Sequence, residues 1–389
     1  MLCLHYMKRE RNIRTRRFRP VAAMLAVAAT GGLVAYWSRA AEPIAAFETE
    51  SGTRSGGARL VANGSASGGS VVQFAAALSD DELPASVKAA GNYTLKWSDD
   101  FEGSAVDTSK WNVLNKSNYG SGNNEDECYT SANATVAGGL LNLTAKRETV
   151  SGCGTNPQGG SNYYWTSGAL TTRAMGGSLK YAFTEGDAQV KLKAPRGNPY
   201  WPAFWLVSSG ESGEPGWPDY GEFDVVELYG GHPDSAYGTL HYSAGGHVQT
   251  WPNQYNVATK APNSNQGIVV PPLATGAAND WHTYGLLWTS NRLTWYVDGV
   301  PYQYFDGSNN TMYTVSASGT ATAMKTTSAP SANFWGLKHS IILNLAFGGG
   351  GPAYHGYTGY DSASGYTNGN LTADQPGAMQ VDYVRIWQK

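Results

Sequence analysis

The stretch of residues 221–229 most limits what this chain can fold into, because it places three acids inside an apolar run. Apolar residues alternate with Glu222 and Asp224, and this period of two predicts a β-strand with both acids on one face. Glu227 would point to the opposite, core-facing side of a regular strand, where an ionised carboxylate costs several kcal/mol unless it is paired. A β-bulge at residues 225–226 would return all three acids to one face, and we predict that bulge.

Three carboxylates on one face favour acid–base chemistry. With the bulge, Glu222 and Glu227 are spaced like residues four apart, so their Cα atoms would lie roughly 13 Å apart. Their side chains could then lean together to the ~5–5.5 Å of a retaining glycosidase pair. We interpret Glu222 as the nucleophile, Glu227 as the general acid/base and Asp224 as the assisting carboxylate between them. The alternative is an acidic surface strand that binds a cation or is simply solvated.

The sequence Glu-Phe-Asp-Val-Val-Glu resembles the catalytic signature of glycoside hydrolase family 16, in the bulged form of laminarinases, agarases and carrageenases. The resemblance implies an all-β fold, a concanavalin-like β-sandwich jelly roll of two antiparallel sheets with a concave substrate cleft. It also implies retaining endo-hydrolysis with the three roles given above. Segments that resemble the family continue from about Tyr93 to the last residue, at 95–103, 123–129, 165–172, 201–206, 237–242, 341–349 and 381–387.

The composition fits a turn-rich β-protein with aromatic surfaces, since the chain has 48 Gly, 13 Trp and 24 Tyr and a net charge of −3. No basic field outside the N-terminus invites nucleic acid. Aromatic faces stack on sugar rings, so the composition is compatible with a polysaccharide cleft, and the resemblance to laminarinases implies a β-glucan polysaccharide as the partner. The double-displacement mechanism requires no organic cofactor. We expect a monomer.

Residues 123–129 resemble a family loop that lines the sugar cleft, and Asn124, Glu125 and Tyr129 are the binding candidates from it. The family usually has Gln where Glu127 stands, which predicts a changed hydrogen bond at that position. The alternative for the loop is a polar surface turn.

Three tryptophans and one histidine are further binding candidates. Trp201 and Trp205 lie four apart in a segment that resembles laminarinases, so they would share one strand face as sugar platforms. Trp217 lies just before the acidic strand. His241 resembles a family histidine that orients a carboxylate or a sugar hydroxyl near Glu227. The alternatives are core tryptophans and a purely structural histidine.

Two cysteines remain once Cys3 is assigned to an N-terminal signal. In an oxidising compartment Cys128 and Cys153 suggest one disulfide that closes a loop of about 25 residues. By chain entropy it would stabilise the fold by ~3 kcal/mol. In relatives, an aspartate of the closing strand often helps to hold a structural calcium, so Asp382 is the calcium candidate implied by the resemblance.

The chain divides into three expected parts. Residues 1–40 combine a basic flank, an apolar run and small residues, which indicates a signal peptide cleaved after Ala40 or an uncleaved membrane anchor. Residues 41–90 read as a Gly/Ser/Ala-rich linker, and residues 91–389 as the catalytic domain. The catalytic part is therefore expected to be secreted, or exported and anchored in the membrane.

The expected substrate is β-1,3-glucan, because residues 201–205 look laminarinase-like. An agarase- or carrageenase-type galactanase, a transglycosylase and a non-catalytic glucan-binding protein are the alternatives. In the last third of the chain, residues 293–300 predict a hairpin with Asp298 and Gly299 as its two-residue turn.

Overall fold

The fold is taken from a computed structural model, which describes parts of the chain. The described residues are 44–45, 58–62, 70–74, 83, 87–88, 91–117, 123, 125–157, 159–175, 177–195, 200–229, 235–250, 255–256, 261–262, 281–316, 318–348, 360–361, 365–366 and 377–389. All of them fall within the unit Ile44–Lys389. The expected signal or anchor at residues 1–40 and the binding candidate Asn124 lie outside the described residues.

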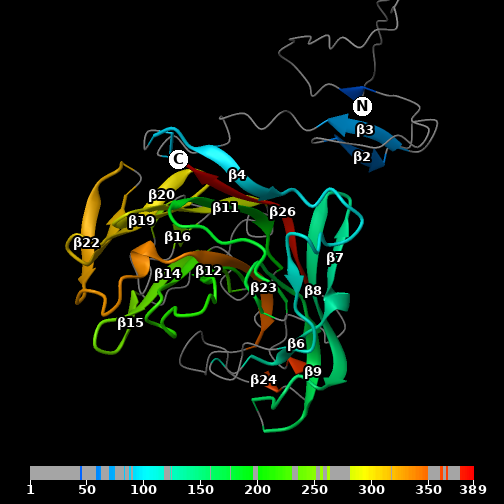
Figure 1. The fold of residues 1–389 in the computed structure, drawn as a ribbon. Helices are drawn as coiled ribbons and strands as arrows, with labels where there is room; N and C mark the ends of the chain where they lie inside the picture. Colours follow the sequence, from blue (N-terminus) through cyan, green and yellow to red (C-terminus); the bar gives the residue numbers. More distant parts are fainter. Residues whose placement is uncertain are drawn as a thin grey trace, which may run out of the picture. The chain divides into compact units, whose positions relative to one another are not determined.

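Two large sheets make up most of the described structure (Figure 1). The nine-stranded sheet contains β5 (Asn112–Val113), β10 (Ala169–Thr171), β12 (Tyr200–Ser208), β13 (Glu222–Glu227), β14 (Ser235–Ser243), β15 (His247–Thr250), β16 (Tyr255–Asn256), β17 (Ala261–Pro262) and β23 (His339–Phe347). The twelve-stranded sheet contains β4 (Thr94–Asp99), β6 (Glu127–Tyr129), β7 (Ala134–Ala137), β8 (Leu140–Ser151), β9 (Asn162–Ser167), β11 (Gly186–Lys193), β18 (His282–Thr289), β19 (Arg292–Val297), β20 (Val300–Asp306), β21 (Thr311–Val315), β22 (Ala321–Thr326) and β26 (Gly377–Gln388).

The smaller elements complete the described set. They are β1 (Ile44–Ala45), β2 (Ala58–Ala62), β3 (Ser70–Phe74), β24 (Tyr360–Asp361), β25 (Gly365–Tyr366) and the 3₁₀ turns η2 (Ser131–Asn133) and η4 (Phe334–Gly336). Strands β1 to β3 pair with one another in a three-stranded sheet inside the expected linker. The linker boundaries stay a prediction. No helix in the described part of the chain is long and apolar enough to cross a membrane.

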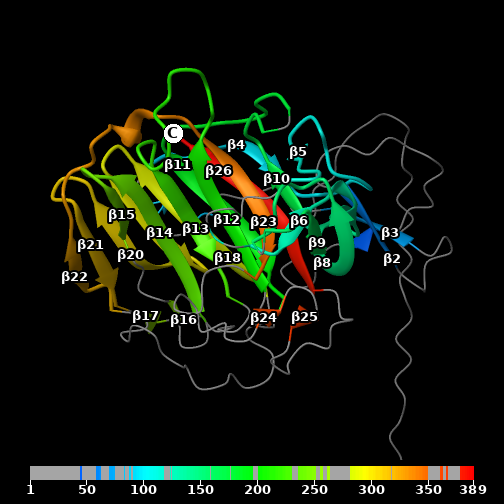
Figure 2. The same cartoon turned by 90° about the horizontal axis from the view of Figure 1, so that it is seen from below.

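The two large sheets stack face to face, as Figure 2 shows for β12, β13 and β23 over β11, β18 and β26. Alternation along each strand sends every second side chain into the layer between them. The ring of Phe223 on β13 thus packs edge-on against Trp288 on β18, with centroids 5.2 Å apart. Burial of each such side chain contributes about 1.5–3 kcal/mol. The expected all-β sandwich of two sheets is confirmed, and the pairing of β6 with β9 is a local parallel exception to its antiparallel order.

One residue from each sheet helps to fix the position of the acidic strand. Trp295 on β19 donates its indole N–H to the backbone carbonyl of Asp224 at 2.7 Å, across the layer between the sheets. A Cβ at Gly238 on β14 would lie 2.2 Å from the Trp295 ring, so only glycine permits this close approach.

The predicted hairpin is confirmed as β19 and β20, with positive φ at both Asp298 and Gly299.

Candidate active site

Strand β13 contains the predicted bulge. Asp224 pairs with Thr239 and Glu227 with Tyr237, so three steps on β13 face two steps on β14. Residues 225–226 supply the extra position, and both valines are buried in the core between the sheets. The three acids therefore share the other side of β13, which we call the acid face, and the sequence prediction on this point is confirmed.

The acid at each position faces a partner on β14. His241 is the direct cross-strand partner of Glu222. Its Nε2 lies 3.2 Å from Asp224 Oδ2 and 3.8 Å from Glu222 Oε1. Trp217 donates its indole N–H to Glu222 Oε2 at 3.1 Å, while 51% of this tryptophan remains exposed. His241 and Trp217, both candidates from the sequence, are thus brought to the acids.

Glu227 receives three donors of its own. Trp201 Nε1 and the Tyr229 hydroxyl donate to Oε1 at 2.9 and 3.2 Å. The Thr239 hydroxyl donates to Oε2 at 3.4 Å. The carboxyl at the far end of the bulge is therefore held in one orientation by groups from β12, β14 and the residues just after β13.

Burial sets the protonation behaviour of the three acids. Loss of solvation raises the pKa of Glu222, Asp224 and Glu227 to about 8 each. The negative charge of Asp224 adds to the rise for both glutamates, whereas the His241 charge opposes it. Groups this close titrate together, so the cluster does not carry three full negative charges at neutral pH. One site thus holds both a proton to give and a carboxylate to attack.

Among the described residues, one group of side chains has donor atoms close enough to hold a metal ion. It consists of Glu222, Asp224 and His241, whose donor atoms lie within 4.8 Å of one another. This group is part of the acid face itself, so the cation-binding alternative from the sequence and the catalytic interpretation use the same residues.

Comparison with known proteins identifies the family. The family model described as Beta-porphyranase A-D, GH16 domain, matches residues 93–331, more than half of the chain. The chain belongs to glycoside hydrolase family 16. A Beta-glucanase from Rhodothermus marinus is 30% identical over 308 residues, which cover 77% of this chain and 86% of that protein.

Two further relatives place the chain within family 16. Glucan endo-1,3-beta-glucosidase A1 from Niallia circulans is 32% identical over 312 residues, 77% of this chain but only 39% of that longer protein. The solved structure of an endo-beta-1,3-glucanase from Pyrococcus furiosus has a TM-score of 0.53 and 28% identity, and it covers 76% of this chain and 94% of that one. The chain is thus similar to family 16 enzymes that are named as glucanases.

The aspartate that the family 16 resemblance gives as a calcium candidate, Asp382, lies on β26. Its Oδ2 forms a salt bridge with Lys191 Nζ at 2.8 Å. No group of metal-ligating side chains within the described ranges includes Asp382. The role of Asp382 stays an untested prediction.

The tryptophans of β12 lie as the alternation predicts. Trp201 and Trp205 are both partly exposed, while Phe204 and Leu206 between and beyond them are fully buried. Trp205 is the cross-strand neighbour of Asp224, which places its ring on the acid face. Either tryptophan can therefore meet a sugar on that face.

The two described binding candidates of the 123–129 loop are buried. Glu125 is 4% exposed and Tyr129 is fully buried, so they do not belong to a polar surface turn. Asn344 Nδ2 donates to the Tyr129 hydroxyl at 2.9 Å, and Trp205 Nε1 donates to Asn344 Oδ1 at 2.8 Å. These residues reach the acid face through Trp205, and a direct contact with sugar stays a prediction.

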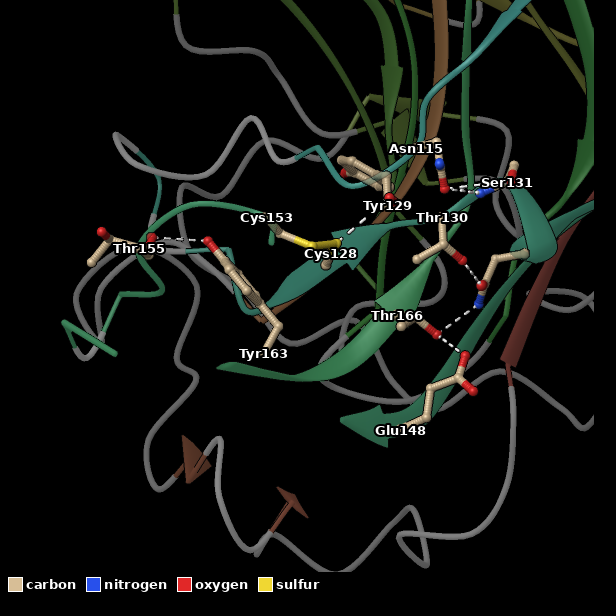
Figure 3. Close-up of a disulfide and its surroundings, with 11 residues drawn as sticks. Asn115, Cys128, Tyr129, Thr130, Ser131, Glu148, Cys153, Thr155, Tyr163 and Thr166 are labelled. Carbon is tan, nitrogen blue, oxygen red and sulfur yellow. Dashed lines mark hydrogen bonds between the residues drawn. A yellow bond between two sulfur atoms is a disulfide. The ribbon is translucent and has the colours of Figure 1, made fainter. Parts of the chain in front are cut away.

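The predicted disulfide joins Cys128 on β6 to Cys153 just after β8, with Cα atoms 5.9 Å apart (Figure 3). Cys128 lies between Glu127 and Tyr129, so the bridge ties the buried part of the loop to the strand beside it. The prediction of one disulfide is confirmed.

Two residues of the site were missed by the sequence analysis. Tyr229 lies two positions after Glu227, which is the spacing of one strand face. His247 opens β15, and its Nε2 lies 3.0 Å from His241 Nδ1. The ring of His247 also packs against Trp217, with centroids 4.6 Å apart. The turn Ser-Ala-Gly-Gly between the two histidines was the signal that a hairpin could bring them together.

Proposed function

We propose that this chain is a retaining endo-β-1,3-glucanase that acts on laminarin-type polysaccharide. The observation that carries the proposal is the bulge of β13, which gives Glu222 and Glu227 separate sets of partners on one face. The names of the glucanase relatives support the substrate class.

The reaction begins with Glu227 as the acid. Trp201 and Tyr229 both donate to its Oε1, whereas Oε2 has only the longer 3.4 Å contact with the Thr239 hydroxyl, so we assign the acidic proton to Oε2. Glu227 gives this proton to the glycosidic oxygen while a Glu222 oxygen attacks the anomeric carbon. The bond to the leaving sugar breaks and a glycosyl–enzyme ester forms on Glu222.

In the second step, Glu227 has become a carboxylate and takes a proton from water. That water attacks the anomeric carbon, releases Glu222 and gives a product with retained configuration. Trp217 and His241 hold the Glu222 carboxyl for both steps. The reaction uses these side chains and water, so we propose no cofactor. Competition between water and a second sugar at this intermediate decides between hydrolysis and transglycosylation.

A galactan is the second candidate substrate, because the matching family model is described for β-porphyranases. The mechanism would be unchanged, since the same acids would attack a galactose unit. We favour glucan because the relatives reported above at 28–32% identity are named as glucanases.

Export of the catalytic part belongs to the same proposal. A disulfide between Cys128 and Cys153 persists in an oxidising compartment, which supports secretion or presentation outside the cytoplasm.

Product analysis tests the proposal. The full chain and its Glu222→Ala variant are incubated separately with laminarin, mixed-linkage glucan, agarose, carrageenan and porphyran. Oligosaccharides from laminarin that vanish in the variant are the expected result. Release from a galactan alone would keep the mechanism and replace the substrate. Binding to laminarin without any product would move the chain to a glucan-binding protein.

A further inference from the structure

A second pair of carboxyls is linked to the acid face through Tyr129, Asn344 and Trp205. Glu125 and Glu127 are two positions apart, and their side chains are 4% and 0% exposed. The spacing places them, together with Tyr129, on the same side of the segment that forms β6. Two ionised carboxylates cannot share such a site, because neither solvent nor an opposite charge separates them. One of the pair must keep a proton, and the surrounding hydrogen bonds tell which.

The direction of each hydrogen bond follows from Trp205. An indole nitrogen can only donate, so the Asn344 atom that meets Trp205 Nε1 at 2.8 Å must be the amide oxygen. The Asn344 NH₂ group then donates to the Tyr129 hydroxyl at 2.9 Å. Tyr129 in turn directs its own proton to Glu125 Oε2, at 3.4 Å. The chain of donors therefore ends on Glu125.

The other oxygen of Glu125 is also an acceptor. Asn123 Nδ2 donates to Oε1 at 3.2 Å. Two side-chain donors thus converge on Glu125, and hydrogen bonds to the charged form of a carboxyl favour that form, so Glu125 is the member of the pair to which we assign the negative charge.

Glu127 has the opposite arrangement. Its Oε2 accepts the backbone N–H of Phe347 at 2.7 Å, which leaves Oε1 to carry the proton. Burial first, and then the charge of Glu125, raise the pKa of Glu127 well above its ordinary value. Burial also raises the pKa of Glu125, but the hydrogen bonds to its carboxylate act against that rise.

The titratable groups around the pair add no positive charge. Asp126 and Tyr129 lie on the same segment, and Tyr163 faces it from β9. Burial, followed by the charges of the acids at 125–127, raises the pKa of Tyr163. From β23 the contacts are the Asn344 amide and the Phe347 N–H, neither of which titrates.

We propose that Glu127 is a carboxylic acid that stays neutral beside an ionised Glu125, and that Glu125 positions Asn344 and Trp205 through Tyr129. The ionised Glu125 anchors Tyr129, Tyr129 orients the Asn344 amide, and Asn344 holds the indole of Trp205 on the acid face. The effect on sugar binding rests on the proposed function, whereas the assignment of the proton does not.

Matched amide variants test the assignment. In Glu127→Gln the remaining oxygen accepts from Phe347 and the NH₂ group replaces the protonated oxygen, so the neutral charge and the Phe347 bond are both kept. In Glu125→Gln one acceptor oxygen must serve the donors that two oxygens served. We expect the melting temperature at pH 6 to stay within about 2 °C for Glu127→Gln and to fall by more than about 5 °C for Glu125→Gln. The melting temperature of Glu127→Ala should also fall, whereas that of Glu127→Gln should stay near the wild-type value.

The dependence on pH gives a second readout. An acid whose pKa is raised in the fold loses stability as pH rises from its ordinary pKa to the raised one, because the unfolded chain releases the proton first. The wild-type protein should lose stability in this way because of Glu127, whereas Glu127→Gln has no such acid at that position. The melting temperature of the variant relative to wild type should therefore climb between about pH 5 and pH 9.

The kinetic readout is the Michaelis constant on laminarin. Glu125→Gln should raise KM by about 5- to 10-fold with less than about a 2-fold change in kcat, because it loosens Trp205 and leaves the acids in place. Equal destabilisation by both glutamine variants, a reversed order, or an unchanged pH slope for Glu127→Gln would overturn the assignment. If Glu125→Gln does not fold, the Glu127→Gln slope decides alone. If the wild-type chain neither binds nor cleaves laminarin, the proposed function is wrong, and the melting temperatures still test which carboxyl of the pair holds the proton.

Discussion

The chain contains two buried groups of carboxyls that behave differently. On the acid face, Glu222 and Asp224 keep 16% and 6% of their side-chain exposure and lie next to an imidazole. Beyond Asn344, Glu125 and Glu127 form a sealed group, buried among acids, a phenol and amides. Burial makes both groups hold protons. Only the group with water on one side and His241 beside it can release a proton and take it back, which is what a general acid/base must do.

The largest effect should come from the nucleophile. Glu222→Gln keeps the shape of the side chain and its contact with Trp217 but cannot form the glycosyl ester. We expect laminarin hydrolysis, followed as reducing ends, to fall by about 10⁴-fold or more. The melting temperature should not fall, because one of three clustered acids becomes neutral. A variant with substantial activity would show that the acid face is not the catalytic site.

The next largest effect should come from the acid/base, Glu227, whose proton on the acid face should be lost within the measurable pH range. Burial raises the pKa of Glu227 from 4.5 to about 8, so its acid form survives through neutral pH and is lost as pH rises through about 8. Wild-type kcat/KM should therefore decline on the alkaline side near pH 8. Glu227→Gln should lower kcat by about 10²–10⁴-fold and abolish that decline. An alkaline decline that persists in the variant would assign it to another group.

The disulfide lies next to the sealed group, because Cys128 directly follows Glu127. Replacing Cys128 and Cys153 together by serine frees a loop of 25 residues in the unfolded chain. We expect the free energy of unfolding, measured by urea titration, to fall by about 3 kcal/mol. The alkaline decline of kcat/KM should stay where it is, since Glu227 is on β13, in the other sheet. A shift of that decline would mean that the two groups are coupled through β6.

Local patterns predicted the acid face well because its constraints lie close together in sequence. The conflict between Glu227 and strand alternation located the bulge, and the spacing of Trp201 and Trp205 gave their shared face. The burial of Glu125 and Tyr129 could not be foreseen. It depends on Asn344, about two hundred positions away on β23, and on how the two sheets stack. A short polar segment by itself does not distinguish a surface loop from one covered by a distant strand.

The smallest effect should come from His247, the exposed histidine that the sequence analysis missed. Its Nε2 meets Nδ1 of His241, so it fixes the ring whose Nε2 faces Asp224. Its own pKa is lowered by burial and by His241, so it stays neutral and can serve as the fixed partner. We expect His247→Ala to lower kcat by about 3- to 10-fold, and His247→Gln, which can keep one hydrogen bond, to lose less. If His241→Ala is made first, the added loss from His247→Ala should vanish in a double-mutant cycle. Additive losses would mean that His247 acts through Trp217, whose ring it also contacts, and that the histidines do not work as a pair.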